Sequence, residues 1–383
     1  MKEEPMPTCA GQPPLPLAGV KVVDFSTLLP GPLATLILAE AGASVIKIEP
    51  PQGDDARGGP FAVNGEPIGF ALLNHSKRSL ALNLKDPAQR AVLLPLLREA
   101  DLLVEQFRPG VMARFGFDYT SVAALNPRLI YCSITGYGQT GPKAHRAGHD
   151  LNYMADTGVA ELAADTDGHP VIAPALVADV GGGSYPAVIN ILLALRQRET
   201  TGRGCHLDIA MADNILPFAF WAYGQALLGE PAAPGRGILT GGLPRYRIYR
   251  TACGRYLAVA ALEQKFWEVT CRATGLAEQF WDDAYDPEAT AEALAACIAR
   301  KTAQEWAELF ADQDACVSVV SDLATAHADP HFAARGLFAD TVRVRERVVD
   351  AMPLPIVPGL RRPPSERVMP ELGEDNAEFL GSA

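Results

Sequence analysis

Two ionisable side chains in this 383-residue sequence, His149 and Asp179, have neighbours that suit acid–base chemistry. His149 lies between Gly148 and Asp150, before an apolar run that is typical of a helix. Asp179 lies 30 positions later, near the end of an apolar run that favours a strand, and just before the three glycines at 181–183. Glycine has no Cβ, so the backbone there can approach a ligand closely, and the N-terminus of a following helix favours developing negative charge. The pattern predicts an acid–base site.

Both residues also have a purely structural interpretation. Asp179 could act only as the N-cap of the helix expected over residues 185–198, and His149 could be a buried, hydrogen-bonded imidazole. His145 and His149 are four residues apart, which raises a metal site, but no nearby Glu completes H-E-x-x-H and no third ligand has a suitable spacing. The local pattern leaves the first two alternatives open and predicts no metal.

Three further places carry residues that suit ligand binding or catalysis. Lys77 and Arg78 are adjacent cations ahead of an expected strand, where they could hold phosphates or form a solvated basic turn. Glu105 lies where another strand gives way to a loop, the place where open α/β sheets bind ligands, and Arg114 follows one helical turn beyond. That loop could equally be an ordinary connection between a strand and a helix. Glu263 ends a strand and could cap the next helix or reach a site from another domain.

The composition is that of a soluble globular protein, with 48% hydrophobic and 20% charged residues, and the length exceeds one typical domain. The formal net charge of -12 disfavours a nucleic-acid-binding surface and gives no reason to expect a membrane partner, and no apolar run is expected to reach membrane-spanning length. Seven cysteines occur singly, without C-x-x-C, which favours reduced thiols in a cytoplasmic protein. Residues 1–16 are Pro-rich and lack the apolar core of a signal peptide, so they predict a loose tail.

Residues 17–228 predict a large Rossmann-like, doubly wound α/β domain. A strand over 17–25, a helix over 33–41 and a strand over 44–49 form a β-α-β unit, so a right-handed crossover and a parallel sheet follow. The same alternation continues along the domain, without the G-x-G-x-x-G or Walker A phosphate motifs. Further strands are expected over residues 79–84, 100–105, 129–134 and 202–210, and a long helix over 211–228.

Residues 229–327 predict a linker followed by a small α+β domain. Residues 229–244 are rich in Gly and Pro without periodicity, which is typical of a linker. Residues 246–262 alternate around a central turn and predict a β-hairpin, and several Ala-rich helices follow. Residues 328–383, rich in Pro and charge with a strand-like stretch at 341–345, predict a segment that returns to the large domain.

Many short blocks, in order along nearly the whole chain, resemble the family III CoA-transferase superfamily, and within it the α-methylacyl-CoA racemase branch. So many ordered matches are far more specific than any one of them. The blocks are L-A-G-V-K-V-V-D-F, S-V-I-K-I-E, N-H-S-K-R-S-L-A-L-N-L-K, F-R-P-G-V, T-G-Y-G-Q-T-G-P, A-G-H-D-L-N-Y, the loop around Asp179, T-G-G-L-P-R-Y and A-L-E-Q-K-F-W.

The resemblance implies an interlocked homodimer that binds acyl-CoA thioesters and needs no cofactor beyond their CoA moiety. Asp179 and His149 would be the two acid–bases of a racemase that inverts the α-carbon of a 2-substituted acyl-CoA through an enolate. Tyr153 and Glu263 would support them by hydrogen bonds. The alternative is a CoA-transferase that moves CoA between carboxylic acids, with Asp179 as the nucleophile that forms thioester intermediates. Contacts to CoA would fall on Leu73, Asn74, Lys77, Arg78, Glu105, Phe107, Arg114, Ala147 and Gly148.

Three residues depart from the family pattern that the resemblance brings with it. Pro50 stands where many members carry Arg, which affects one contact to adenine or phosphate. Arg245 stands where racemases tend to have an aromatic or apolar residue, and Asp156 where they usually have an apolar one. These two changes allow a more polar acyl pocket than one for a simple branched chain.

Overall fold

A computed structural model of the protein describes residues 14–380, except Thr166 and Ala232, and divides the chain into two compact units. Unit 1 consists of Met1–Asp150, Leu176–Asn214 and Arg335–Ala383, and unit 2 consists of Leu151–Ala175 and Ile215–Ala334. The division differs from the predicted boundaries, because residues 151–175 and 215–228 group with the smaller unit. Residues 1–13 of the predicted N-terminal tail lie outside the described residues.

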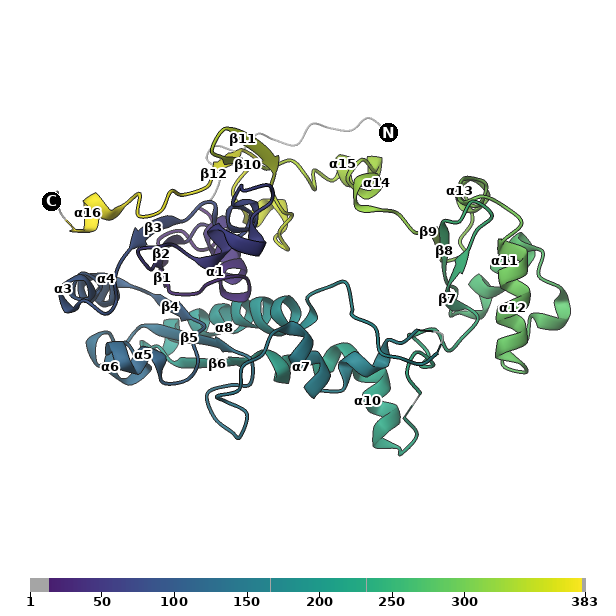
Figure 1. The fold of residues 1–383 in the computed structure, drawn as a ribbon, viewed down its shortest axis with the longest axis horizontal. Coiled ribbons are helices and arrows are strands. Elements are labelled where there is room, and N and C mark those ends of the chain that lie inside the picture. The colour runs from purple at the N-terminus through teal and green to yellow at the C-terminus, as the bar shows by residue number, and fades with distance from the viewer. Residues whose placement is uncertain (1–13, 166, 232, 381–383) are drawn as a thin grey trace. The chain divides into compact units, whose positions relative to one another are not determined.

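Unit 1 is built on a six-stranded parallel sheet with strand order β3-β2-β1-β4-β5-β6, as the prediction of a doubly wound domain requires (Figure 1). The order reverses between β1 and β4, and ligands of open α/β sheets bind beyond the carboxyl ends of the strands at such a switch point. Every residue of β5 and of β4 is buried, which is typical of parallel strands covered on both faces. The strands are β1 (Lys21–Asp24), β2 (Ser44–Glu49), β3 (Arg78–Ala81), β4 (Leu102–Glu105), β5 (Ile130–Thr135) and β6 (His206–Ala210).

The helices of unit 1 cover both faces of this sheet. On one face α1 (Pro30–Glu40) packs beside α8 (Tyr185–Thr201), and α1 is buried along its whole length. Gly31 is required at the start of α1, because a Cβ there would lie 2.1 Å from the Cβ of Ser26. The other helices of unit 1 before α8 are α2 (Ile68–Asn74), α3 (Pro87–Ala91), α4 (Leu93–Glu99), α5 (Val111–Phe115) and α6 (Tyr119–Leu125), and α9 (Met211–Asn214) follows β6. Helix α7 (Asp150–Asp156) begins at the last residue of the first segment of unit 1, and its other residues belong to unit 2.

The C-terminal segment from Arg335 onward belongs to unit 1, where the sequence placed it, whereas residues 328–334 of the predicted segment group with unit 2. It forms a three-stranded sheet of β10 (Thr341–Val344), β11 (Arg347–Asp350) and β12 (Glu366–Val368), and ends in α16 (Asn376–Leu380). The turn before α16 covers the edge strand β3, since the backbone N–H of Asp375 donates to the carbonyl oxygen of Ser79 at 3.1 Å. The segment therefore closes one edge of the main sheet.

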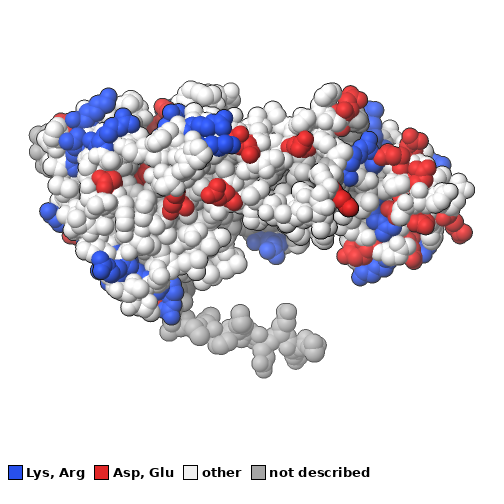
Figure 2. All heavy atoms as spheres, turned by 90° about the horizontal axis from the view of Figure 1, so that it is seen from below, with Lys and Arg blue, Asp and Glu red and all other residues white. Residues whose placement is uncertain are grey.

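Unit 2 contains the predicted hairpin in an antiparallel sheet with order β7-β8-β9, packed against helices around the buried Trp267 and Trp306. Its strands are β7 (Tyr246–Arg250), β8 (Tyr256–Ala260) and β9 (Val317–Val319). Its helices are α10 (Phe220–Leu227), α11 (Gln264–Thr274), α12 (Pro287–Ile298), α13 (Ala303–Phe310), α14 (Leu323–His327) and α15 (Pro330–Ala334). On the face drawn in Figure 2, acidic and basic side chains are interspersed over the part with α11–α13, in line with ion pairs such as Arg272–Glu268.

The predicted long helix over residues 211–228 is broken in the structure. The chain instead forms α9, a short 3-10 turn over Leu216–Ala219 and then α10. Pro217 lies in the middle of the break, and a proline lacks the N–H that a continuous helix needs.

One helical stretch, Val177–Thr201, is long and apolar enough to cross a membrane by length and composition, with a mean hydropathy of 1.3 over its best window. The expectation that no apolar run reaches that length is therefore wrong, because the helix begins eight residues before α8, in a wide π-helical turn named η4 (Val177–Ser184). In unit 1 one side of α8, with Ala187, Ile191 and Ala194, is buried in the core.

Candidate active site

Asp179 lies on η4, the wide helical turn that leads into α8, and not at the end of a strand as the apolar run before it predicted. The turn is fixed against the start of α1, because the Ser184 hydroxyl donates to the carbonyl oxygen of Pro30 at 2.8 Å. A Cβ on Gly183 would come within 3.1 Å of the Pro30 ring, so glycine permits this contact. Since Pro30 follows β1, η4 lies at the carboxyl ends of the strands, where a ligand is expected.

Asp150 joins the two predicted catalytic residues. It follows His149 directly, is 9% exposed, and its Oδ1 atom accepts the backbone N–H groups of Ala178 at 2.7 Å and of Asp179 at 2.9 Å. The segment that carries His149 is thereby bound to the turn that carries Asp179. Sequence alone did not mark Asp150 as a site residue, because its only signal was an acidic residue next to His149 at the start of an expected helix.

The surroundings of Asp179 favour its protonated form. Burial, together with repulsion from the Asp150 carboxylate, raises the pKa of Asp179 to about 6, and His149 acts in the opposite direction. A carboxyl group with such a pKa can accept or return a proton near neutral pH. Among the described residues, α8 takes no side-chain cap at its N-cap residue Ser184, so the alternative in which Asp179 only caps this helix is not what the structure shows.

Tyr153 and Glu263, the two predicted supports, both belong to unit 2. Tyr153 is a buried residue of α7, three positions after Asp150. Glu263 is exposed at the N-cap position of α11, but within the described part of the chain its carboxylate makes no capping hydrogen bond to that helix. The capping alternative for Glu263 is therefore not realised, and its supporting role stays a prediction.

The ammonium group of Lys77 is inside unit 1, which does not support its predicted contact with a CoA phosphate. It donates to the Asn74 side chain at 2.8 Å and to the Pro32 carbonyl at 2.9 Å, and it pairs with Asp24 at 3.3 Å. Burial lowers the pKa of Lys77 to about 8, although the Asp24 carboxylate opposes this. Asn74 is also buried and hydrogen-bonded within unit 1, because its side chain donates to the Phe70 carbonyl.

Arg78 is also engaged within the chain, at the other end of the strands from Asp179. It is the first residue of β3, so it lies at the amino edge of the parallel sheet. Its guanidinium pairs with Asp375 and Glu378 and lies 4.7 Å from the centre of the Phe379 ring. These contacts bind the C-terminal helix to the sheet, and they do not support the predicted phosphate role.

The remaining predicted CoA contacts mostly surround the carboxyl edge. Glu105 ends β4 at the switch point, where it is 4% exposed and accepts the N–H of Phe107 at 2.8 Å. Burial raises the pKa of Glu105 to about 7. Phe107 is half-buried, Arg114 is exposed in the last turn of α5, and Leu73 is half-buried in α2. Ala147, exposed, and Gly148, half-buried, immediately precede His149.

Two departures from the family pattern, Arg245 and Asp156, differ in how exposed they are. Arg245 does not present a free charge, because its guanidinium is paired with Asp283 and both side chains are largely buried in unit 2. Asp156 is exposed at the end of α7. Of these two residues, Asp156 is the exposed one, and its role in a more polar acyl pocket stays a prediction.

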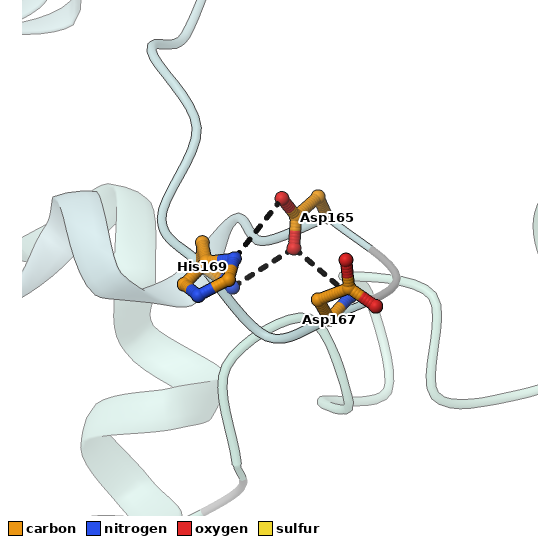
Figure 3. A group of neighbouring side chains, drawn as sticks. All are labelled: Asp165, Asp167 and His169. Carbon is orange, nitrogen blue, oxygen red and sulfur yellow. Dashed lines mark hydrogen bonds and ion pairs between the residues drawn. The ribbon is translucent and has the colours of Figure 1, made fainter.

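Asp165, Asp167 and His169 converge on one exposed loop of unit 2, as Figure 3 shows. Their hydrogen bonds account for the turn itself, since Oδ1 of Asp165 accepts the backbone N–H groups of Asp167 and His169, each at 2.9 Å. The imidazole of His169 lies 3.5 Å from the other carboxylate oxygen of Asp165. This group contains neither His145 nor His149, the pair whose spacing suggested a metal site in the sequence.

Comparison with known proteins places this geometry in a family. The model of the family described as CoA-transferase family III matches residues 17–376. Alpha-methylacyl-CoA racemase of Homo sapiens is 33% identical over 368 residues, 95% of this chain and 92% of the relative. Acetyl-CoA:oxalate CoA-transferase of Acetobacter aceti is 34% identical over 342 residues, 86% of this chain and 87% of the relative.

Solved structures agree with these relatives. A CAIB/BAIF family protein from Brucella suis has a TM-score of 0.80 at 29% identity, over 96% of this chain and 99% of that chain. The orthorhombic form of Rv3272 from M. tuberculosis has a TM-score of 0.81 at 27% identity, over 96% of this chain and 99% of that chain. The chain belongs to the family III CoA-transferases, whose members similar to it include both racemases and CoA-transferases.

Proposed function

We propose that this protein is an acyl-CoA racemase or epimerase, which inverts the α-carbon of a 2-substituted acyl-CoA by proton transfer through an enolate. The observation that carries the proposal is the pairing of His149 and Asp179, whose segments are bound together by Asp150. An ionisable imidazole and a carboxyl group with a pKa of about 6 interact electrostatically there. Such a pair can exchange protons with a carbon acid near neutral pH.

The reaction needs two groups because the α-proton of a thioester is only weakly acidic. One group removes the proton, and the other, already protonated, returns a proton to the opposite face of the planar enolate. Asp179 and His149 can share these roles in both directions when their pKa values lie close together, and the raised pKa of Asp179 brings it towards that of an ordinary imidazole.

The second candidate is a CoA-transferase, in which the Asp179 carboxylate attacks an acyl thioester and CoA passes to a second carboxylic acid. The identities of the relatives favour neither activity, since racemases and CoA-transferases match at 33% and 34%. The transferase reaction gives His149 no necessary role. The structure supports the racemase better because it binds the His149 segment to Asp179 through a buried residue.

A homodimer is part of the proposal. Tyr185, Ile189, Leu192 and Leu193 are exposed on α8, at spacings that place them on one side of the helix. An exposed apolar face of this kind is suited to a protein–protein interface. Light scattering at micromolar concentration tests this, and a stable monomer would contradict it.

The reaction is tested with a chiral 2-methylacyl-CoA in deuterated water, with and without a free carboxylic acid. The racemase incorporates deuterium at the α-carbon and loses optical purity without any acceptor. Transfer of CoA that depends on the acceptor, with no α-proton exchange, would show that the transferase assignment is the correct one.

A further inference from the structure

Arg245, the residue just before β7, holds the turn between β8 and α11 from both sides of Glu263. Its Nη1 atom donates to the carbonyl oxygen of Leu262 at 3.1 Å, and both Nη atoms lie 3.4 Å from the side-chain oxygen of Gln264. The backbone of the turn is bound to the same residue, because the N–H of Ala261 donates to the Arg245 carbonyl at 2.8 Å. Arg245 therefore contacts the chain immediately before and immediately after Glu263.

The position of Arg245 is itself fixed. Its Nε atom donates to Asp283 at 2.8 Å in a two-pronged ion pair, with the side chains 13% and 8% exposed. The guanidinium also lies 5.0 Å from the centre of the Trp267 ring, on the first turns of α11. A planar guanidinium that is paired at one edge and stacked on an aromatic ring has little freedom to rotate.

The ion pair with Asp283 also argues against a role for Arg245 in binding a carboxylate of the substrate. Its charge is balanced by Asp283 inside unit 2, so capture of a carboxylate on a substrate would require breaking a buried pair and leaving Asp283 uncompensated. Glu263, in contrast, is exposed, and within the described residues its carboxylate makes no capping hydrogen bond to α11. The contacts of Arg245 therefore stabilise the turn and leave the Glu263 carboxylate accessible.

We infer that Arg245 is a positioning residue that fixes Glu263 for the reaction, and that it is not a receptor for a second carboxylate on the acyl group. The inference rests on the proposed function and on the predicted role of Glu263 as a hydrogen-bond support. It further implies that the acyl-CoA need not be a dicarboxylic one.

The test compares Arg245→Met, Arg245→Lys, Glu263→Gln and the double variant Arg245→Met/Glu263→Gln in the α-proton exchange assay. Misplacement of a group at a site lowers turnover, so Arg245→Met lowers kcat by roughly 10–100-fold with little change in KM. Arg245→Lys retains part of kcat, and the double variant is no slower than Glu263→Gln, since both changes remove the same contribution. Arg272→Met is the matched control, because Arg272 also joins an ion pair and an aromatic contact, with Glu268 and Trp281.

Two outcomes overturn the inference. One is a rise in KM for a dicarboxylyl-CoA alone in Arg245→Met, and the other is a double variant whose loss is the product of the two single losses. If the wild type transfers CoA and exchanges no proton, the proposed function fails separately. The same variants are then compared in the transfer assay, where an unaffected Glu263→Gln also overturns the inference.

Cys316 gives a readout that needs no reaction. Burial and the nearby Glu263 carboxylate raise the pKa of this exposed thiol. Its alkylation, followed against pH by peptide mass spectrometry, shifts to lower pH in Glu263→Gln and also in Arg245→Met if the turn is released. An unchanged profile in Arg245→Met shows that Glu263 is still in place, and it overturns the inference whichever reaction the enzyme performs.

Discussion

Asp150 holds Asp179 by its backbone: Oδ1 of Asp150 accepts the N–H of Asp179 at 2.9 Å, while its negative charge opposes ionisation of the Asp179 side chain. Asp150 thus fixes the place of the candidate acid–base and adds to the effect of burial in raising its proton affinity. Because Asp150 also follows His149, the short sequence G-H-D carries one member of the pair and binds the turn that carries the other.

Replacing Asp150 should separate these two effects. Asp150→Asn keeps an acceptor oxygen but removes the charge, so the pKa of Asp179 falls below its present value of about 6. For the direction in which Asp179 must be ionised, the acid limb of the pH–rate profile therefore moves to lower pH. The profile of α-proton exchange measures this shift, and a limb that stays in place would show that another group titrates there.

Asp150→Ala is the matched variant that removes the acceptor as well. It leaves the N–H groups of Ala178 and Asp179 without their partner, and Ala178 is fully buried. Loss of a buried acceptor costs about 1–3 kcal/mol of unfolding free energy. Denaturant unfolding should show this loss in the alanine variant and much less of it in the asparagine variant.

Arg78 and Arg114 should differ in their effect on CoA binding. Arg114→Ala weakens binding of CoA by about 1–3 kcal/mol if its exposed guanidinium holds a phosphate. Arg78→Ala leaves CoA affinity unchanged, because Arg78 pairs with Asp375 and Glu378 at the opposite edge of the sheet. It instead reduces the free energy of unfolding, by about 1 kcal/mol or less for a partly exposed ion pair. Calorimetric titration with CoA at low salt measures the first effect, and equal losses of affinity in both variants would contradict this assignment.

These residues show what sequence alone could and could not reveal. The strands β1, β4 and β5 were predictable because parallel strands buried on both faces are continuous apolar runs. The run before Asp179 has the same composition, and apolar composition alone does not separate a buried strand from a buried helix. The adjacency of Lys77 and Arg78 itself argues against a shared phosphate site, since adjacent residues of an extended chain point to opposite sides and do not both face one ligand.

The non-local contacts were beyond the reach of the sequence. Asp283, which neutralises Arg245, is 38 positions away, and Asp375, which pairs with Arg78, is 297 positions away. Neither partner belongs to a local motif. The tertiary fold alone decides that these two arginines are structural, whereas the pair of His149 and Asp179 was predictable from residue types and a family resemblance.

His75 should make the protein less stable in acid. It is 2% exposed, and burial lowers its pKa to about 4, with Arg367 and Lys77 adding to this and Glu40 opposing it. Its Nε2 atom has no hydrogen-bond partner among the described residues. The unfolded chain binds a proton at about pH 6.5 and the folded chain only near pH 4, so stability is present above pH 6.5 and is lost as pH falls towards 4.

The loss attributable to His75 is up to about 3 kcal/mol. Thermal unfolding between pH 7 and pH 4 measures it, and His75→Gln, which does not titrate, should flatten the dependence over that window. His169→Gln, which replaces an exposed imidazole of unit 2, is the matched control. A His75→Gln variant that loses stability in acid as steeply as the wild type would assign the effect to other groups.

His149 distinguishes the two proposed reactions most directly. In the racemase, His149→Ala removes one of two acid–bases, so racemisation falls by roughly 10²-fold or more. Exchange of the α-proton can persist for one enantiomer, because Asp179 still serves one face of the α-carbon. Measuring deuterium incorporation separately for each enantiomer therefore gives an asymmetric loss. In Asp179→Asn the loss falls on the opposite enantiomer. If instead His149→Ala retains full CoA transfer to a free carboxylic acid, and hydroxylamine traps an acyl group on Asp179, then Asp179 is a nucleophile and His149 is not part of the chemistry.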